Sequence, residues 1–218
     1  MGPPRHVFVT GGTGYVGRRV VGELLGRGHE VRALVRPGSE GKLPTGCEAV
    51  SGNALDEKSF APRVAPADTF LQLVGVAHPS PARAAEFRSV DLVSAKASAK
   101  AAAAAGVSHF VYVSVAQPAP VMKAYVAARA EGEAAIRSAR LNATFVRPWY
   151  VLGPGHRWPY LFLPVFRLLQ ALPATRDTAR RLYPVTLARI VATLVAAVEN
   201  PAEGIRIIET PEIRRARL

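Results

Sequence analysis

The sequence is poor in cysteine, in acidic residues and in long apolar runs. Cys47 is the only cysteine among 218 residues, so neither an intramolecular disulfide nor a multi-cysteine metal site can form. No window of 18 or more apolar residues lacks a charge or a proline, which argues against a membrane-spanning helix. The N-terminal residues contain no apolar signal-peptide core. Together these features predict a cytoplasmic protein.

The charge of the chain is strongly basic. Lys and Arg number 28 against 16 Asp and Glu, which gives a net charge of +12 and a pI of about 10.7. Such a chain attracts anions of many kinds. The arginines are mostly spaced singly, without interleaved aromatic residues, which argues against a nucleic-acid partner. The five histidines lack metal-ligand spacing, so no metal site is expected.

Strand-like and helix-like segments alternate along the first two thirds of the chain. A short apolar run at 6–10 precedes a glycine loop, a helical pattern that stops at Gly28, and a second strand at 30–36. Further strands are predicted at 47–52, 68–76, 107–115 and 143–148, and helices at 84–105 and 121–140. This alternation predicts an α/β fold, a doubly wound parallel sheet of the Rossmann type.

The segment after residue 150 is less regular. A helix at 186–200 and a strand at 204–209 stand out. We expect residues 1–218 to form a single domain, in which residues 150–218 build a small cap over the carboxyl edge of the sheet. The apolar stretch 158–172 has two interpretations. It is either a lid over a hydrophobic substrate pocket, favoured by Pro159, Pro164 and Pro173, or an exposed face for a membrane surface or a protein partner.

The glycine loop predicts a dinucleotide site. Gly11, Gly14 and Gly17 are spaced G-x-x-G-x-x-G, directly after a strand and at the start of a helix. In such a loop the first glycine makes the turn and the second lets the backbone approach a pyrophosphate. The third lets the helix pack on the strand, and the helix N-terminus attracts the phosphate charge.

The residue at the end of the second strand predicts which dinucleotide binds. Arg36 lies 19 residues after Gly17, and residues 32–36 include no acid. NAD-preferring sites usually place Asp or Glu here, whereas arginine accommodates the 2′-phosphate of NADP. We therefore expect NADP as the cofactor, with NAD as the alternative.

Several motifs together resemble a known family. They are TGGTGYVGRRVV, RALVR, GNALD, HFVYVS and TFVRPWYVLGPG. The chain resembles the atypical and extended, epimerase-like short-chain dehydrogenase/reductases, and most of all their NmrA-like and complex I 39-kDa-subunit-like members. The resemblance runs from about residue 6 to residue 209. It implies a Rossmann sheet with NAD(P) across the carboxyl ends of the strands.

The resemblance also implies which residues contact the cofactor. Some belong to the glycine loop, others lie beside the adenine, under the nicotinamide ribose, or at the strand end near the nicotinamide. They are Gly11, Thr13, Gly14, Tyr15, Val16 and Gly17; Asn53 and Ala54; Val74, Gly75 and Val76; and Pro148.

The catalytic residues that the resemblance implies are Ser114, Tyr125 and Arg129. The family uses a Tyr as proton donor, a Lys four residues later and a Ser on the preceding strand. This chain keeps the Ser and the Tyr but carries Arg129 in place of the Lys, and Asp91 where active members commonly carry Asn. A guanidinium can stabilise a tyrosinate but cannot pass a proton. Glu131 and Glu133, on the same helix, are expected to be surface charges.

Two functions follow from these residues. The first is an oxidoreductase that transfers hydride between NADP(H) and a small carbonyl-type substrate. The second is a catalytically weak or inactive NADP(H)-binding sensor, regulator or assembly factor. The intact Ser114 and Tyr125 favour the first, and Arg129 in the Lys position favours the second.

Overall fold

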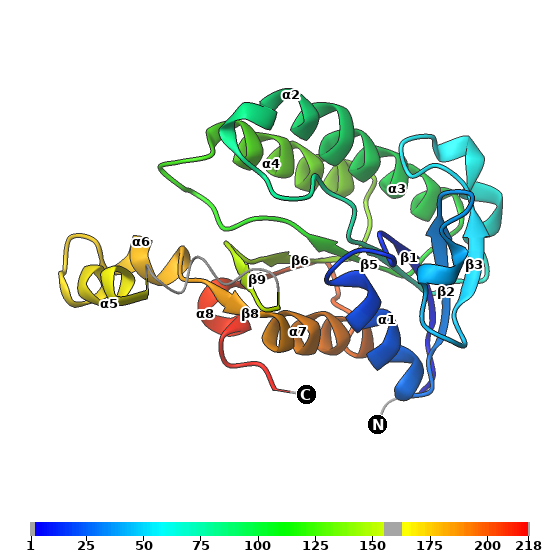
Figure 1. Cartoon of the computed structure of the whole chain (residues 1–218). Helices are drawn as coiled ribbons and strands as arrows, with labels where there is room; N and C mark the ends of the chain where they lie inside the picture. The colour runs from blue at the N-terminus through cyan, green and yellow to red at the C-terminus, as the bar shows by residue number, and fades with distance from the viewer. Residues whose placement is uncertain (1–2, 155–162, 218) are drawn as a thin grey trace.

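The computed structural model describes residues 3–154 and 163–217, which are built around a seven-stranded, wholly parallel sheet (Figure 1). The spatial order of its strands is β3-β2-β1-β4-β5-β6-β9. The strands are β1 (His6–Thr10), β2 (Glu30–Val35), β3 (Glu48–Ser51), β4 (Thr69–Gln72), β5 (His109–Val113), β6 (Ala143–Arg147) and β9 (Ile205–Glu209). The predicted doubly wound α/β sheet is confirmed.

The strand order places a switch point between β1 and β4. From β1 the chain proceeds outward through β2 to β3, then returns to β4 on the other side of β1. Connections therefore leave these two neighbouring strands in opposite directions. Open parallel sheets bind ligands in the crevice that this reversal opens outside the carboxyl ends of the strands.

Helices cover both faces of the sheet (Figure 1). On one face α1 (Gly17–Gly26) lies beside α7 (Leu187–Glu199), and their buried aliphatic side chains pack on Val7 and Val9 of β1. On the other face α3 (Val93–Ala104) and α4 (Lys123–Ser138) cover a layer of aromatic rings that includes Phe70 and Phe110. The buried residues of α3 are alanines and serines, and such small side chains leave room for the rings.

Two predicted elements differ from the sequence analysis in ways that shape the site. Strand β4 ends at Gln72 rather than at residue 76, because the Gln72 side chain accepts a hydrogen bond from the Val74 backbone N–H. The helix predicted at 84–105 is divided into α2 (Ala84–Glu86), a π-helical turn (Phe87–Leu92) and α3. Short 3₁₀ turns lie at Glu40–Lys42, Glu57–Ser59, Ala61–Arg63 and Pro81–Arg83.

The C-terminal third of the chain contributes to the sheet as well as to the periphery. Strand β9 is the seventh strand of the sheet, and α7 covers one of its faces. The sequence analysis assigned residues 150–218 to a cap, and this assignment is wrong for α7 and β9. The remaining elements are β7 (Val151–Leu152), α5 (Leu163–Ala171), α6 (Arg176–Arg181), β8 (Val185–Thr186) and α8 (Thr210–Ile213). Strands β7 and β8 pair in parallel as a separate two-stranded sheet.

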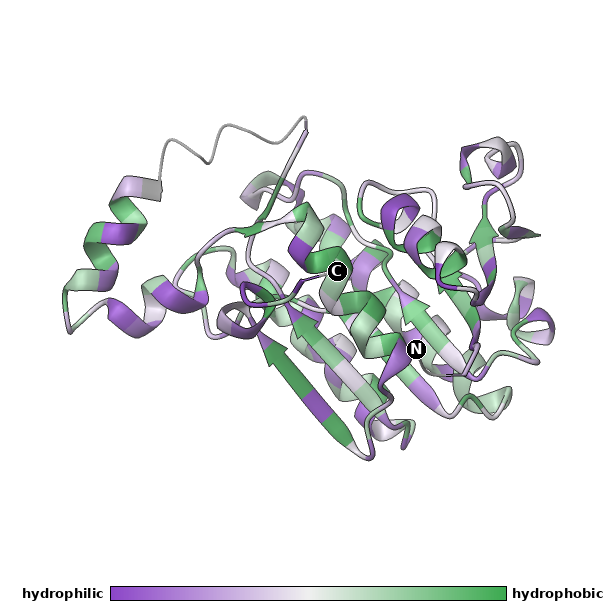
Figure 2. Cartoon of the chain, turned by 90° about the horizontal axis from the view of Figure 1, so that it is seen from below, coloured by the Kyte–Doolittle hydropathy of each residue, from purple (hydrophilic) through white to green (hydrophobic). Residues whose placement is uncertain are grey.

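Helices α5 and α6 project from the body of the molecule (Figures 1 and 2). Of the predicted apolar stretch 158–172, residues 158–162 lie outside the described part of the chain. In α5 and just after it, Val165, Leu168 and Leu172 are exposed. These three side chains therefore do not wall an apolar pocket. No helix in residues 3–154 and 163–217 is long and apolar enough to cross a bilayer.

Candidate active site at the carboxyl edge of the sheet

The glycine loop connects β1 to α1 as a tight turn at the switch point. Gly11 has φ +80°, and a Cβ there would lie 2.8 Å from the carbonyl carbon of Leu73, just after β4. A Cβ on Gly17 would overlap the carbonyl oxygen of Gly11. The loop thus brings its own backbone against the end of β4 and against the first turn of α1.

The N-terminus of α1 is open to an anion. Val16 precedes the helix without a side-chain cap, and the first turn holds no acidic residue. Gly14 is exposed and its N–H donates to the Gly11 carbonyl, while Arg18 N–H donates to the Gly14 carbonyl. The first N–H groups of a helix that lack a cap are the donors that bind phosphate in Rossmann proteins. The loop therefore fits a dinucleotide pyrophosphate.

The other predicted loop residues lie around this turn. Thr13 is half-buried. Tyr15 and Val16 pack against the aliphatic core on the α1 and α7 side of the sheet. The Tyr15 hydroxyl lies over Gly153, just after β7, where a Cβ would overlap it. Tyr15 therefore connects the glycine loop to the segment that follows β6.

The residues predicted for the adenosine half lie at the ends of β2 and β3. Arg36 directly follows β2, is exposed, and forms no ion pair with any described residue. Asn53 is exposed after β3, and its Oδ1 accepts a hydrogen bond from the Leu55 N–H. Ala54 packs at the margin of the aromatic core. The Arg36 guanidinium is thus available to an anion beside the strand end.

A buried hydrogen-bond chain fixes the floor between β1 and β4. Thr10 donates its hydroxyl proton to the Gln72 Oε1 at 2.6 Å, and the Gln72 amide donates to Ser94 of α3 at 3.1 Å. The same Gln72 Oε1 accepts from the Val74 N–H at 2.7 Å. These bonds set the path of residues 73–76, where the sequence predicts contacts to the nicotinamide ribose.

Gly75 lies directly on a buried ion pair between Asp91 and Arg129. The Arg129 Nη2 is 2.7 Å from the Asp91 Oδ1, and the two side chains are 5% and 0% exposed. Arg129 also donates to the Val113 carbonyl, and Asp91 accepts from the Val76 N–H at 3.0 Å. A Cβ at residue 75 would overlap the guanidinium, so a larger residue here would displace Arg129 from its place beside Asp91. The pair joins α4, the π-helical turn and the loop after β4.

The buried pair changes the acidity of its members and of Tyr112. Burial raises the pKa of Asp91 above its usual range, although the Arg129 charge opposes this rise. Burial also raises the pKa of Tyr112 to about 12, and the Arg129 guanidinium stands 5.7 Å from the centre of this ring. Asp91 therefore offsets the positive charge that Arg129 brings under the loop.

Tyr125 is half-buried in the first turn of α4. Its ring centre is 4.9 Å from that of Phe87, and it belongs to a small apolar cluster that includes Val76. The Arg129 guanidinium carbon is 5.3 Å from the centre of the Tyr125 ring. The structure thus brings Tyr125, Arg129 and the loop after β4 together.

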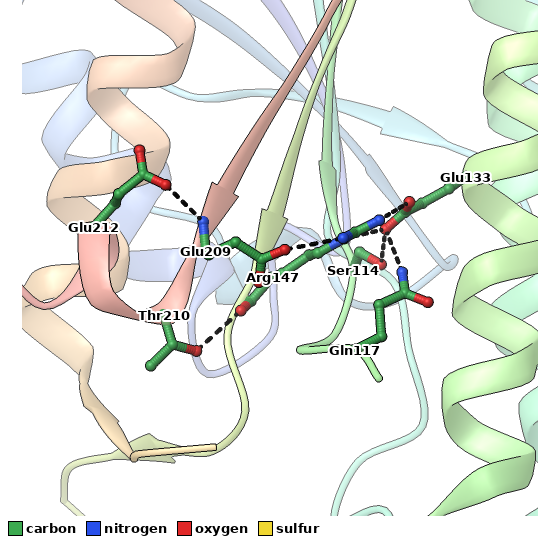
Figure 3. Close-up of polar contacts among 7 residues, drawn as sticks. All are labelled: Ser114, Gln117, Glu133, Arg147, Glu209, Thr210 and Glu212. Atoms are coloured by element: carbon green, nitrogen blue, oxygen red, sulfur yellow. Dashed lines mark hydrogen bonds and ion pairs between the residues drawn. The ribbon is translucent and has the colours of Figure 1, made fainter. Parts of the chain in front are cut away.

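Ser114 belongs to a separate polar network (Figure 3). Its hydroxyl donates to the Glu133 Oε1 at 2.6 Å, and Gln117 donates to the same oxygen at 3.0 Å. Arg147 holds Glu133 at 2.6 Å and Glu209 at 2.9 Å. No hydrogen bond joins Ser114 to Tyr125 in the described part of the chain. Pro148 follows Arg147, and its carbonyl accepts from the Ala116 N–H.

The expected surface position of Glu133 is wrong. Its side chain is only 5% exposed, whereas that of Glu131 is 43% exposed and pairs with Arg88. Helix spacing could have revealed the difference, because Tyr125, Arg129 and Glu133 follow one another at i, i+4 and i+8 on the face turned to the sheet. Asp91 was noticed in the sequence as an exception to the family pattern, but its ion pair was not predicted.

A family model described as "NAD(P)H-binding" matches residues 11–156. The chain belongs to this family. Membership of this family agrees with the dinucleotide site that the glycine loop predicts. The chain is 30% identical over 212 residues to a ceramide reductase from Caulobacter vibrioides, a match that covers 96% of this chain and 65% of the reductase.

Solved structures with the same fold carry bound nucleotides. WbmH from Bordetella bronchiseptica, in complex with NAD+, superposes with a TM-score of 0.70 at 18% identity, over 95% of this chain and 76% of WbmH. A Thermus thermophilus UDP-glucose 4-epimerase in complex with NAD gives 0.67 at 19% identity, over 96% and 81% of the two chains. At these identities the likeness establishes the fold of this NAD(P)H-binding protein.

Proposed function

We propose that the protein is an oxidoreductase that transfers hydride between NADP(H) and a carbonyl-type substrate, with Tyr125 as the proton donor. The observation that carries this proposal is the position of Tyr125. Its half-buried ring packs with Val76 on the loop after β4, one strand away from the uncapped N-terminus of α1. The likeness to a ceramide reductase supports a reductase rather than an epimerase.

Bound nicotinamide would supply or accept the hydride, and the chain's own residues would manage the proton. The Tyr125 hydroxyl would give its proton to the substrate oxygen. Arg129 stays charged, because the neighbouring Tyr and Asp side chains hold its pKa above the usual arginine value despite burial. It therefore orders the Tyr125 ring and the loop after β4, and relays no proton. Ser114 already donates its proton to Glu133, so it serves the substrate only as an acceptor.

The alternative is an NADP(H)-binding sensor or regulator without turnover. Two observations favour it. Asp91 offsets the charge of Arg129, and the Ser114 proton is held by Glu133. Both features weaken the stabilisation of a tyrosinate and of a developing alkoxide that a reductase requires.

The cofactor preference gives the first test. We expect NADP(H) to stabilise the protein more than NAD(H) at equal concentration, because Arg36 is exposed and without an ion pair in the described part of the chain. A ligand at 100 times its Kd adds about 2.7 kcal/mol to the free energy of unfolding. Thermal denaturation with each nucleotide measures the difference.

Two variants serve as controls for that titration. Arg36→Gln should equalise the two responses. Gly14→Val should remove both while the apo protein remains folded, because the only described atom within 4 Å of a Cβ at Gly14 is the Gly11 carbonyl oxygen, at 3.2 Å. An equal or larger response to NAD(H) in the wild type would contradict the role of Arg36.

The proton donor gives the second test. In Tyr125→Phe the ring still packs on Phe87 but the hydroxyl is lost, so any reductase rate should fall by roughly 10²- to 10⁴-fold. NADPH binding should change by less than about 1 kcal/mol, the net worth of one hydrogen bond. The measurement is NADPH oxidation with a panel of aldehydes, quinones and ketones, including a long-chain ketone, with binding titrated in parallel.

The outcomes separate the two functions. Turnover in the wild type that Tyr125→Phe leaves unchanged would exclude Tyr125 as the donor. Tight NADPH binding without any turnover in the wild type would favour the sensor. Arg129→Lys is the matched variant that tests the cation. It restores the Lys that the family carries and gives up the second hydrogen bond of Arg129, the one to the Val113 carbonyl.

A further inference from the structure

A cavity of about 860 Å³ opens beyond the ends of β5 and β9. Its wall is formed by residues of α5, α6, the first turn of α7, the end of β9, and α8 with the two residues after it, together with Gln117, which follows β5. Half of its lining residues are arginines: Arg180, Arg181, Arg189, Arg214 and Arg215. The cavity lies at the carboxyl edge of the sheet, on the side where β6 and β9 end.

The arginines of this cavity have no carboxylate partner among the described residues. The lining includes two acids, Asp177 and Glu209, and Glu209 is already held by Arg147 at 2.9 Å. Some arginines elsewhere in the chain do pair with acids, for example Arg27, Arg32 and Arg83. Five arginines against two acids leave an excess of positive charge in the cavity, and such an excess concentrates anions.

Other polar groups of the cavity also lack partners. The buried amide nitrogen of Gln170 makes no hydrogen bond to a described atom, and neither does the buried Oε2 of Glu209. A ligand with acceptor oxygens and a hydroxyl would satisfy both. Arg214 is held in place by stacking, with its guanidinium 3.9 Å from the centre of the Tyr183 ring, which in turn packs on Phe166 of α5.

We propose that this cavity binds the phosphate group of a phosphorylated substrate. A guanidinium offers two parallel N–H donors to phosphate, and the five arginines outnumber the two carboxylates of the lining by enough to neutralise a dianion. Gln117 and Glu209 line the cavity and also belong to the network around Ser114. The proposal that the cavity binds phosphate depends only on the cavity and its arginines. The proposal that this phosphate belongs to the substrate rests on the proposed oxidoreductase function.

The test measures phosphate binding with the cofactor site already filled. Inorganic pyrophosphate and glycerol 3-phosphate are titrated by calorimetry into the full chain saturated with NADP(H). Phosphatidylcholine vesicles with and without phosphatidic acid are tested by co-sedimentation. We expect Arg181→Gln/Arg214→Gln to weaken phosphate binding by about ten-fold or more, since each variant side chain loses a charge-assisted contact. The matched control, Arg63→Gln/Arg140→Gln, removes the same charge from exposed positions outside the cavity.

Each result decides the proposal. Weaker phosphate binding in the cavity variant but not in the control variant supports the proposal. Binding in the calorimetric titration indicates a free phosphate ester, and binding only to vesicles with phosphatidic acid indicates a lipid headgroup. Equal binding by wild type and cavity variant, equal loss in both variants, or no binding by the wild type in either arm overturns it. If thermal denaturation shows that Arg181→Gln/Arg214→Gln does not fold, the variant Arg180→Gln/Arg215→Gln, which changes two exposed side chains of the cavity, replaces it. Failure of NADPH turnover alone would contradict the oxidoreductase and leave the phosphate site standing.

Discussion

Replacement of Gly17 by valine is expected to abolish both folding stability and nucleotide binding. A Cβ at this position would overlap the Gly11 carbonyl oxygen and lie 2.9 Å from the Gly12 Cα. Both neighbours are backbone atoms of the loop itself, so no side-chain rotation can relieve the clash. Moving α1 away from β1 would open the core around Val20, Val21 and Leu24, which are fully buried. We expect a loss of at least about 3 kcal/mol, the upper range for overpacking.

Gly26→Ala is the matched control at the other end of the same helix. A Cβ there has no described atom within 4 Å, and alanine has the higher helix propensity. This variant should be neutral or more stable by about 0.4–1 kcal/mol. Urea denaturation and NADPH titration of both variants provide the measurement. A Gly17→Val protein as stable as the wild type would show that α1 does not pack on the loop as described.

The fold was predictable because its signals are local. The apolar run at 6–10, the glycine spacing and the helical pattern up to Gly28 each depend on neighbouring residues, and together they specify one βαβ unit. Strand β9 was placed in a cap because its partner β6 lies some 60 residues earlier, and such pairing leaves no local trace. The π-helical turn was missed for a similar reason. Its alanine-rich surroundings read as a regular helix, while the buried Asp91 within it is paired with a residue on α4.

The site was predictable residue by residue but not in its connections. Their spacing in the sequence placed Tyr125 and Arg129 on one helix face. In the structure the Arg129 guanidinium carbon lies 5.3 Å from the centre of the Tyr125 ring. Hydrogen bonds between distant elements could not be read from the sequence. Ser114 was expected to act beside Tyr125. Its hydroxyl instead donates a hydrogen bond to Glu133 of α4, and Arg147 at the end of β6 holds Glu133 in place. The arginines of the cavity come from α6, from α7 and from the residues directly after α8, so no motif joins them.

Asp91→Ala is expected to destabilise the protein by about 3–5 kcal/mol, the cost of leaving one member of a buried ion pair uncompensated. Arg129 would keep its charge at 5% exposure with no carboxylate partner among the described residues, held by the Val113 carbonyl and the Tyr112 and Tyr125 rings. The Val76 N–H would lose its acceptor, so the loop after β4 would lose a hydrogen bond to the π-helical turn. NADPH affinity should therefore fall together with stability. Urea denaturation and nucleotide titration measure the two effects.

The double variant Asp91→Ala/Arg129→Met distinguishes charge from packing. It removes both charges and keeps an unbranched apolar side chain of similar reach beneath Gly75, so no unpaired ion is left in the interior. Replacing a buried pair by apolar groups is often close to neutral, and we therefore expect the double variant to be more stable than Asp91→Ala alone. A coupling energy in the double-mutant cycle within about 0.5 kcal/mol of zero would mean that the two side chains act independently. If stability returns in the double variant while NADPH affinity stays low, the pair holds the cofactor loop through the Val76 N–H rather than through the integrity of the fold.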